Sequence, residues 1–254
     1  MRITLPLSLG ALAVWLALTL GGSWLDTGGV QQSLADEVGG KIGIAWVLAA
    51  LFALAVALAS NDRRAAGICL PTPAKSLWLV WLPLLYTILV LFFAWISGLP
   101  PLGMVLIALC NTALVGLSEE LMFRSVLLQG FLSKYSMWPA ILMSSIIFGS
   151  VHAVNGFTTG DFSSALWQSA SAFLQGVGYA AIRVRTRSVW PMVVVHGLWD
   201  FSLMITMLSP SSSRHQSTMP YAGLLAVLPV FLYGLYLLRG TRGHAMLTPA
   251  TKGT

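Results

Sequence analysis

Two adjacent carboxylates, Glu119 and Glu120, lie within the apolar run from Met104 to Leu128, and Arg124 follows four residues after the second. Each charged side chain at mid-membrane depth costs roughly 2.5–3.5 kcal/mol on insertion scales, so this group needs polar partners or a water-filled cavity. At helical spacing Glu120 and Arg124 share a face and can pair, whereas Glu119 points elsewhere and is free for chemistry. In the alternative interpretation, Arg124 reaches the lipid headgroups and both glutamates only solvate it.

Three more ionisable residues lie in apolar surroundings on two other segments. His152 ends one apolar run, and His196 and Asp200 are one helical turn apart in another, so both point to one side of their helix. Glycines beside the histidines, Gly149 and Gly197, would let the helices approach closely enough to bring these groups together. A single intramembrane histidine is often a hydrogen-bonding residue between helices, so the functional interpretation rests on the whole set.

A carboxylate and imidazoles in a dry cavity form a site that can activate water. The glutamate takes a proton, and the histidines hold the water or the developing oxyanion. A zinc site is the rival arrangement, with Glu119, His152 and His196 as ligands, although the H-E-x-x-H pattern is absent. A Ser-His-Asp triad is disfavoured because no serine lies in a G-x-S-x-G elbow.

The composition predicts a polytopic membrane protein. Of the 254 residues, 57% are hydrophobic and 9% charged, and the mean hydropathy is +0.81, far from the composition of a soluble domain. The net charge of +6 would suggest nucleic acid in a soluble chain, but here the basic residues fall between apolar segments, where they set topology. We therefore expect no nucleic-acid partner. Cys69 and Cys110 show no metal-type spacing.

Eight segments are long and apolar enough to be candidate membrane spans. We expect an all-α bundle of about eight transmembrane helices with an intramembrane catalytic cavity, forming a single integral membrane domain over residues 1–254. The first segment lacks a clear cleavage signature, so we treat it as a retained helix. The expected spans are 3–22, 42–60, 77–97, 104–128, 138–153, 164–182, 189–208 and 220–238.

The loops indicate the orientation of the bundle. With the N-terminus inside, 12 of the 14 Lys and Arg residues fall on the inner side, and only Lys41 and Arg214 fall outside. The loop from Ser23 to Lys41 adds three acidic residues on the outer side. Cytoplasmic loops carry the excess of Lys and Arg, so both termini are expected in the cytoplasm.

The polar groups also form three ordered motifs. Glu119-Glu120-Leu121-Met122-Phe123-Arg124 fits E-E-x-x-x-R, Phe148-Gly149-Ser150-Val151-His152 fits F-x-x-x-H, and His196-Gly197-Leu198-Trp199-Asp200 fits H-x-x-x-(N/D). On separate membrane helices and in this order, they resemble the CAAX-protease and bacteriocin-processing (CPBP, or Abi) family of intramembrane proteases. The motifs place the catalytic core at residues 104–208.

The resemblance implies an eight-helix fold with a cavity that opens toward the cytoplasm, and peptide-bond hydrolysis by a water that a glutamate activates. Carried over residue by residue, it gives two functional pairs and a structural set: Glu119 as general base with His152 as its partner on the water, His196 and Asp200 as the oxyanion-stabilising pair, and Glu120, Arg124 and Phe148 as structural residues. No cofactor is required in this scheme. The family was long described as metal-dependent, so zinc stays as the alternative cofactor.

Two features of this sequence complicate the transfer of residue roles from the family. The eukaryotic prenyl-protein form resembles the third motif with Asn where this chain has Asp200, and an ionised Asp cannot donate to an oxyanion. Asp200 must therefore be protonated or orient His196. Counting from the expected cytoplasmic helix ends, Glu119 and His196 lie at similar depth, whereas His152 comes out deeper.

The leading hypothesis is an intramembrane endopeptidase acting on a membrane-associated protein or peptide, in the bilayer of a prokaryotic plasma membrane. A non-catalytic immunity or scaffold protein of the same fold is one alternative. A proton-coupled transporter that uses the carboxylates as a relay is another, although no internal pseudo-repeat supports it. The sequence does not identify the substrate.

Overall fold

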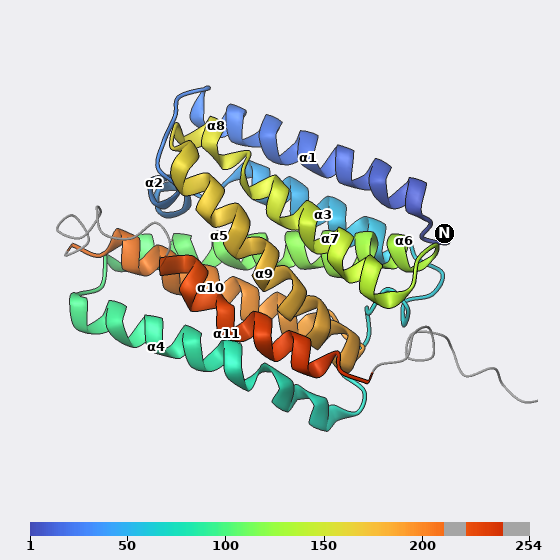
Figure 1. The fold of residues 1–254 in the computed structure, drawn as a ribbon. Coiled ribbons are helices and arrows are strands. Elements are labelled where there is room, and N and C mark those ends of the chain that lie inside the picture. Colours follow the sequence, from blue (N-terminus) through green and yellow to red (C-terminus); the bar gives the residue numbers. More distant parts are fainter. Residues whose placement is uncertain (211–221, 241–254) are drawn as a thin grey trace, which may run out of the picture.

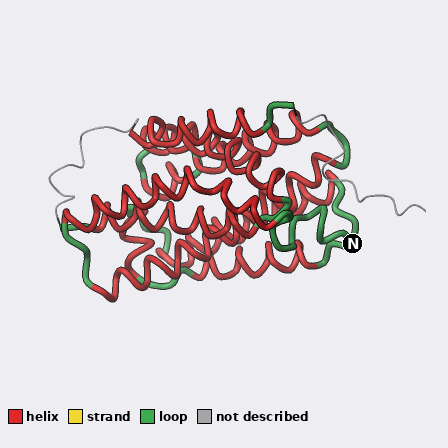
Figure 2. The backbone as a smooth tube through the Cα atoms, turned by 90° about the horizontal axis from the view of Figure 1, so that it is seen from below, coloured by secondary structure: helices red, strands yellow, loops and turns green. Residues whose placement is uncertain are grey.

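A computed structural model describes residues 1–210 and 222–240 of the chain. Within these residues the protein is a bundle of long helices whose axes run roughly side by side (Figure 1), and helices and connecting loops make up all of the described chain (Figure 2). The all-α fold predicted from the sequence is confirmed.

Each of the eight expected spans corresponds to a long helix, although the last expected span starts at residues outside the described part. The long helices are α1 (Leu5–Thr27), α3 (Ile44–Leu58), α4 (Trp81–Ser97), α5 (Leu102–Glu120), α7 (Met137–His152), α9 (Phe162–Thr186), α10 (Trp190–Leu208) and α11 (Ala222–Leu237). Short helical segments adjoin them: α2 (Leu34–Gly40), η1 (Ala74–Val80), η2 (Leu121–Leu127), α6 (Leu128–Leu132) and α8 (Asn155–Thr159).

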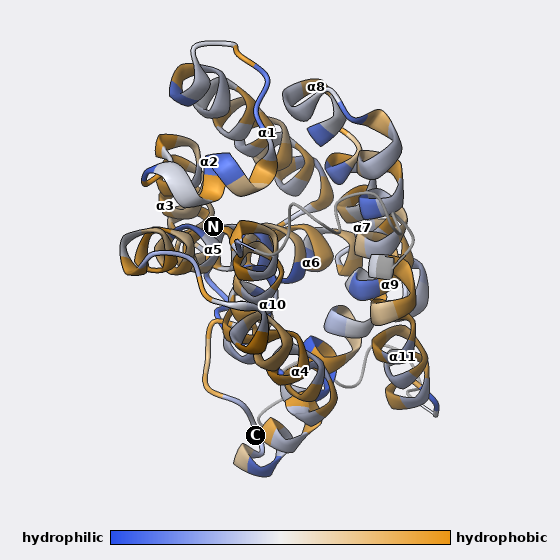
Figure 3. Cartoon of the chain, turned by 90° about the vertical axis from the view of Figure 1, so that its left-hand side faces the viewer, coloured by the Kyte–Doolittle hydropathy of each residue, from blue (hydrophilic) through white to orange (hydrophobic). Residues whose placement is uncertain are grey.

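Five helical stretches of the described chain are long and apolar enough to cross a membrane, or six if the bent pair α2 and α3 forms one span. A polytopic membrane protein is therefore confirmed, whereas the number eight stays a prediction. The α9 helix does not qualify because its residues are less apolar on average than those of the other long helices, and α11 does not qualify because it is short. Viewed along the bundle, hydrophobic residues predominate on the helices, and polar patches lie on α2 and α8 (Figure 3).

The two ends of the bundle can be told apart by their loops. We call one end the N-terminal end. There the amino group of Met1 donates to the carbonyl of Ala59 at 2.8 Å, and backbone hydrogen bonds join the loops after α3 and α9. We call the other end the α2 end, and there the backbone N–H of Gln32 donates to the carbonyl of Thr158 at 3.3 Å. Figure 1 shows the two ends on opposite sides of the molecule.

The charged loops separate in the same way. The loop that holds Arg63 and Arg64 meets the end of α9, which holds Arg185 and Arg187, at the N-terminal end, whereas the acidic segment before Lys41 lies at the α2 end. This arrangement agrees with the alternation on which the expected orientation depends. Three of the basic residues counted for that orientation, Arg214, Arg242 and Lys252, lie outside the described residues.

The α2 end carries a sharp bend. The axes of α2 and α3 differ by 82°, and Asn111 of α5 fixes the turn between them. Its Nδ2 donates to the carbonyls of Val38 and Lys41 at 2.8 and 2.7 Å, and its Oδ1 accepts from the backbone N–H of Gly43 at 3.1 Å. One fully buried amide side chain thereby satisfies three backbone groups where the helical pattern is interrupted.

Glycine contacts bring the helices of the three motifs close together. A Cβ added to Gly116 would lie 2.6 Å from the backbone nitrogen of Gly197, so α5 and α10 touch backbone to backbone. A Cβ on Gly149 would lie 2.7 Å from the carbonyl oxygen of Ser169, which holds α7 against α9. The close approach predicted beside the two histidines is therefore confirmed.

Candidate active site

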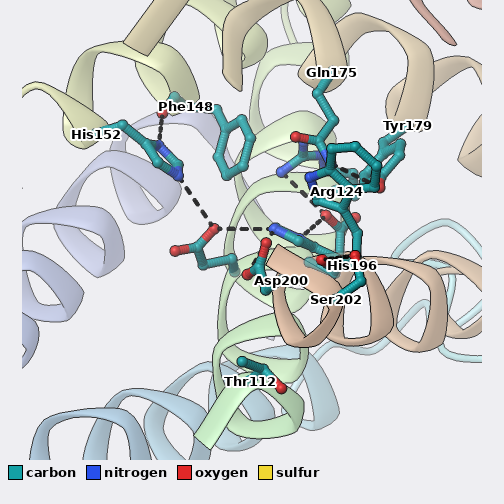
Figure 4. Close-up of polar contacts among 12 residues, drawn as sticks. Thr112, Arg124, Phe148, His152, Gln175, Tyr179, His196, Asp200 and Ser202 are labelled. Atoms are coloured by element: carbon teal, nitrogen blue, oxygen red, sulfur yellow. Dashed lines mark hydrogen bonds and ion pairs between the residues drawn. The ribbon is translucent and has the colours of Figure 1, made fainter. Parts of the chain in front are cut away.

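Three helices bring the ionisable groups to one place. Glu119 and Glu120 are the last two residues of α5, His152 is the last of α7, and His196 and Asp200 lie in α10. Figure 4 shows His152, His196 and Asp200 converging on one space. The Oε2 atom of Glu119 lies 3.9 Å from Nε2 of His152 and 3.7 Å from Nε2 of His196. His196 Nε2 is also 3.5 Å from a carboxylate oxygen of Asp200.

Glu120 has two partners, of which the sequence indicated one. The predicted contact with Arg124 is present, with 3.4 Å between Oε1 and Nη1. The same Oε1 atom lies 2.8 Å from Nδ1 of His196 in a hydrogen bond. Glu120 therefore orients the histidine as well as neutralising the arginine. This second contact could not be predicted from the sequence, because helical spacing relates residues on one helix only.

The segment after the glutamates is a π-helix. All seven residues of η2, Leu121–Leu127, are buried, and π-helical turns are rare insertions that occur frequently at functional sites. The wider turn continues into α6, so α5, η2 and α6 form one helical stretch, Leu102–Leu132. No signal in the sequence distinguishes this turn from an ordinary α-helix.

The longer stretch also changes the expected depth of Glu119. The span expected from the sequence ends at residue 128, whereas the helical stretch continues to Leu132. Glu119 therefore lies farther from the N-terminal end of the bundle than expected, at the level of His152. The extension does not account for His196, which lies only six residues after the start of α10 but whose Nε2 is 3.7 Å from Glu119 Oε2.

The ionisable residues divide into two groups. One group, which we call the cavity-facing group, lines a cavity and consists of Glu119, His152 and Asp200. Their side chains are 14%, 13% and 25% exposed, respectively. The other group, which we call the buried group, consists of Glu120, Arg124 and His196, whose side chains are at most 4% exposed. Adjacent glutamates thus have different surroundings: one carboxylate faces open space and the other is enclosed by its partners.

Aromatic rings hold both histidines. The Phe148 ring centroid lies 4.7 Å from that of His152 and 5.9 Å from that of His196. The guanidinium carbon of Arg124 lies 3.8 Å from the same phenyl centroid, within cation–π range. Phe148 therefore contacts both groups at once, and it separates Arg124 from the cavity-facing histidine.

Two residues of α9 complete the site and were not predicted. The Tyr179 ring lies 5.6 Å from that of His196, and its hydroxyl accepts a hydrogen bond from Nε2 of Gln175 at 2.7 Å. Both residues are buried. The signal that could have found them is a pair of polar residues one turn apart within an expected span.

The cavity has a volume of about 210 Å³ and extends from the catalytic groups toward the α2 end. Its wall is formed by the second half of α1, by α2, by the start of α3 and by α8, besides the three motif helices. No residue of η2 or α6 lines it. The resemblance implied a cavity that opens toward the cytoplasm, but with the N-terminus inside, the α2 end is the outer end. The two expectations therefore conflict in this structure.

The residues proposed as alternative zinc ligands do not form a recognisable metal site. Among the described residues, no group of three or more His, Cys, Asp or Glu side chains is arranged to hold a metal ion. Glu119 Oε2 is 3.7 and 3.9 Å from the two imidazole nitrogens, whereas ligand atoms around a tetrahedral zinc lie roughly 3.3 Å apart for bonds near 2.0 Å.

Comparison with protein families supports the motif analysis. Residues 101–202 match the family described as type II CAAX prenyl endopeptidase Rce1-like. The matched region holds all three motifs, and the match confirms the resemblance to CAAX proteases that the motifs showed. It supports an intramembrane endopeptidase activity in general. A search of curated proteins finds no match to the chain.

Proposed function

We propose that the protein is an intramembrane endopeptidase in which Glu119 activates a water molecule to hydrolyse a peptide bond of a membrane-associated protein or peptide. The observation that carries this proposal is the surroundings of one atom. Oε2 of Glu119 is buried in the cavity wall and accepts no hydrogen bond from the described residues, while two imidazole nitrogens face it. A buried acceptor of this kind is costly unless a ligand or water satisfies it.

His152 supplies the second contact for the water. Its Nδ1 lies 2.8 Å from the carbonyl of Phe148, and a carbonyl can only accept, so Nδ1 carries the proton. In the neutral ring Nε2 is then an acceptor. The 3.9 Å between Nε2 and Glu119 Oε2 exceeds a direct hydrogen bond, and a water that donates to both atoms would bridge it.

His196 is placed to stabilise the oxyanion. Its Nδ1 donates to Glu120, and Nε2 faces the carboxylates of Glu119 and Asp200. The proposed role requires His196 as an imidazolium, in which Nε2 is a donor too. Asp200 then acts by orienting His196, so the aspartate that departs from the family's Asn needs no proton of its own. Arg124 balances the charge of Glu120 behind it.

The reaction then follows in two steps. Glu119 removes a proton as the water oxygen attacks the carbonyl carbon, and Nε2–H of His196 donates to the oxyanion that forms. The C–N bond breaks as Glu119 returns the proton to the departing nitrogen. The products are a carboxylic acid and an amine, and the enzyme regains its starting state.

The test compares membranes of cells that express the wild type with those of cells that express Glu119→Gln. The amide keeps the shape of the carboxylate but cannot take a proton, so cleavage should be abolished. Two readouts are used: release of the C-terminal tripeptide from a prenylated C-a-a-X peptide, and labelling of new protein N-termini by mass spectrometry. Unchanged thermal unfolding in detergent serves as the folding control.

The outcomes separate the alternatives. Neo-N-termini that depend on Glu119, without cleavage of the C-a-a-X peptide, would support the protease with another substrate. Identical N-termini for wild type and Glu119→Gln would support the non-catalytic scaffold. Activity that is lost in excess EDTA and restored by Zn²⁺, with one metal bound per chain, would replace the glutamate mechanism by the zinc-dependent one.

A further inference from the structure

The cavity reaches one end of the bundle and not the other. From Glu119 it passes Val115 and Thr112 of α5 and reaches Glu37 in α2 and Thr158 in α8, both at the α2 end. In the opposite direction all seven residues of η2 are buried, and none of them lines the cavity. A polypeptide that reaches Glu119 along this cavity must therefore come from the α2 end.

The side chains along this path carry negative charge. Three carboxylates line the cavity, Glu37 at the entrance and Glu119 and Asp200 at the inner end, and no Lys or Arg is among the lining residues. Among the described residues, the loops of the α2 end contain one base, Lys41, which is paired with Asp26 at 3.6 Å. A low-dielectric cleft lined by one sign of charge concentrates ions of the opposite sign.

Glu37 is built into the entrance. Its Oε1 accepts a hydrogen bond from Oγ of Ser23 in α1 at 2.9 Å, so the carboxylate is oriented between α1 and α2. The neighbouring Asp36 is exposed and does not line the cavity. Its carboxylate instead accepts from Ser33 at the start of the same helix. The two adjacent acids thus form a matched pair, one inside the entrance and one outside.

We propose that substrate enters from the extracytoplasmic end of the bundle, past α2, and that Glu37 selects segments that carry positive charge. This inference rests on the proposed proteolytic function for the identity of the substrate, whereas the side of access and the charge selection do not depend on cleavage. The substrate class is a basic peptide segment presented at the outer membrane surface. The cytoplasmic tail of a prenylated protein would not reach this entrance.

The test measures access with single cysteines in a background that carries Cys69→Ala and Cys110→Ala. Val115→Cys places a thiol inside the cavity, and Ser133→Cys places one at the exposed N-terminal end. Membrane-impermeant methanethiosulfonates are added to intact cells and to inside-out vesicles. We expect Val115→Cys to react in cells and not in inside-out vesicles, with the reverse for Ser133→Cys.

Each other labelling pattern overturns the proposed side of access. Reaction of Val115→Cys from inside-out vesicles, alone or in addition to cells, would show a path from the cytoplasm. Reaction from neither side would show that the cavity is closed to water. Reaction of Ser133→Cys in intact cells would show that the orientation is reversed. None of these results bears on whether Glu119 is catalytic, which the cleavage experiment decides separately.

Charge selection is read from the rates of two reagents of opposite charge. At Val115→Cys the cationic reagent should react about tenfold faster than the anionic one, after correction for their rates with a free thiol. Adding Glu37→Gln should reduce this ratio by about threefold, and adding Asp36→Asn should leave it unchanged. A ratio that Glu37→Gln does not change, or that both variants change equally, overturns the role of Glu37.

Discussion

The half of the bundle near η2 and the half near α2 differ in packing, although the same helices run through both. Near η2 large side chains such as Phe123, Leu127 and Ile141 are fully buried, whereas toward α2 the helices enclose a cavity. The boundary falls between Glu119 and Glu120. On the proposed function, the packed half holds the catalytic groups in place and the hollow half admits the substrate, so variants in the two halves should fail in different ways.

The largest effect is expected for Arg124→Met. This variant leaves buried Glu120 with His196 as its remaining partner, and breaking a buried ion pair from one side costs about 3–5 kcal/mol. We expect a strongly lowered midpoint of thermal unfolding in detergent, and low expression. Arg124→Lys is the matched control, since it keeps the charge but loses the planar group that stacks on Phe148. If both variants unfold like the wild type, the packed half does not depend on this pair.

The next largest effect is expected for His196→Ala. Loss of one oxyanion donor lowers the rate by about 10²–10³-fold, and here it also removes a hydrogen bond of Glu120. Both cleavage and thermal stability should therefore fall. His152→Ala should abolish cleavage with little change in stability, because its one recorded hydrogen bond is to its own helix. Equal loss of stability in the two variants would contradict the division into buried and cavity-facing groups.

A smaller effect is expected for Gly116→Ala. The added Cβ would lie 2.6 Å from the backbone of Gly197, and such overpacking typically costs about 1–3 kcal/mol. Because α5 and α10 must separate slightly, Glu120 and His196 should also move apart, which lowers activity. Gly103→Ala in the same helix meets nothing within 4 Å and should be neutral or slightly stabilising. Thermal unfolding and cleavage rates of the two alanine variants give the comparison.

The smallest effect is expected for Asp200→Asn. Asp200 is the most exposed member of the cavity-facing group, and the amide keeps an oxygen that can accept from His196. Asn can also donate to an oxyanion, so cleavage should be kept within a few-fold of the wild type. Asp200→Ala should be worse because it removes every contact with His196. A complete loss in Asp200→Asn would show that the carboxylate itself takes part in the chemistry.

Much of the fold could be predicted because its signals are local. Apolar runs gave each long helix to within a few residues, and the spacing of His196 and Asp200 gave their common face. The bend between α2 and α3 could not be predicted, since it depends on Asn111, which lies far away in the sequence. The extension of the Glu119 helix to Leu132 was missed because polar residues near its end resemble a loop.

The candidate site could be predicted as a set of residues but not as a set of contacts. Six ionisable groups in apolar segments are costly unless they meet, and the structure brings all six together. Which nitrogen of His196 faces which carboxylate depends on helix rotation and on the π-helical turn, which a single sequence does not specify. Tyr179 and Gln175 were missed because uncharged polar residues are common in membrane helices and give a weak signal.

The anchoring of the α2 turn by Asn111 has a consequence for the length of substrate that the site can take. Asn111 and Glu119 belong to one helix and are separated by eight residues (119 − 111), which at 1.5 Å per residue is roughly 12 Å. The entrance and the catalytic carboxylate are therefore a fixed distance apart, whatever the loops around α2 do. If the substrate enters past α2 as proposed, an extended peptide spans this distance with about four residues, and α5 sets the separation between the point of recognition and the bond that is cut.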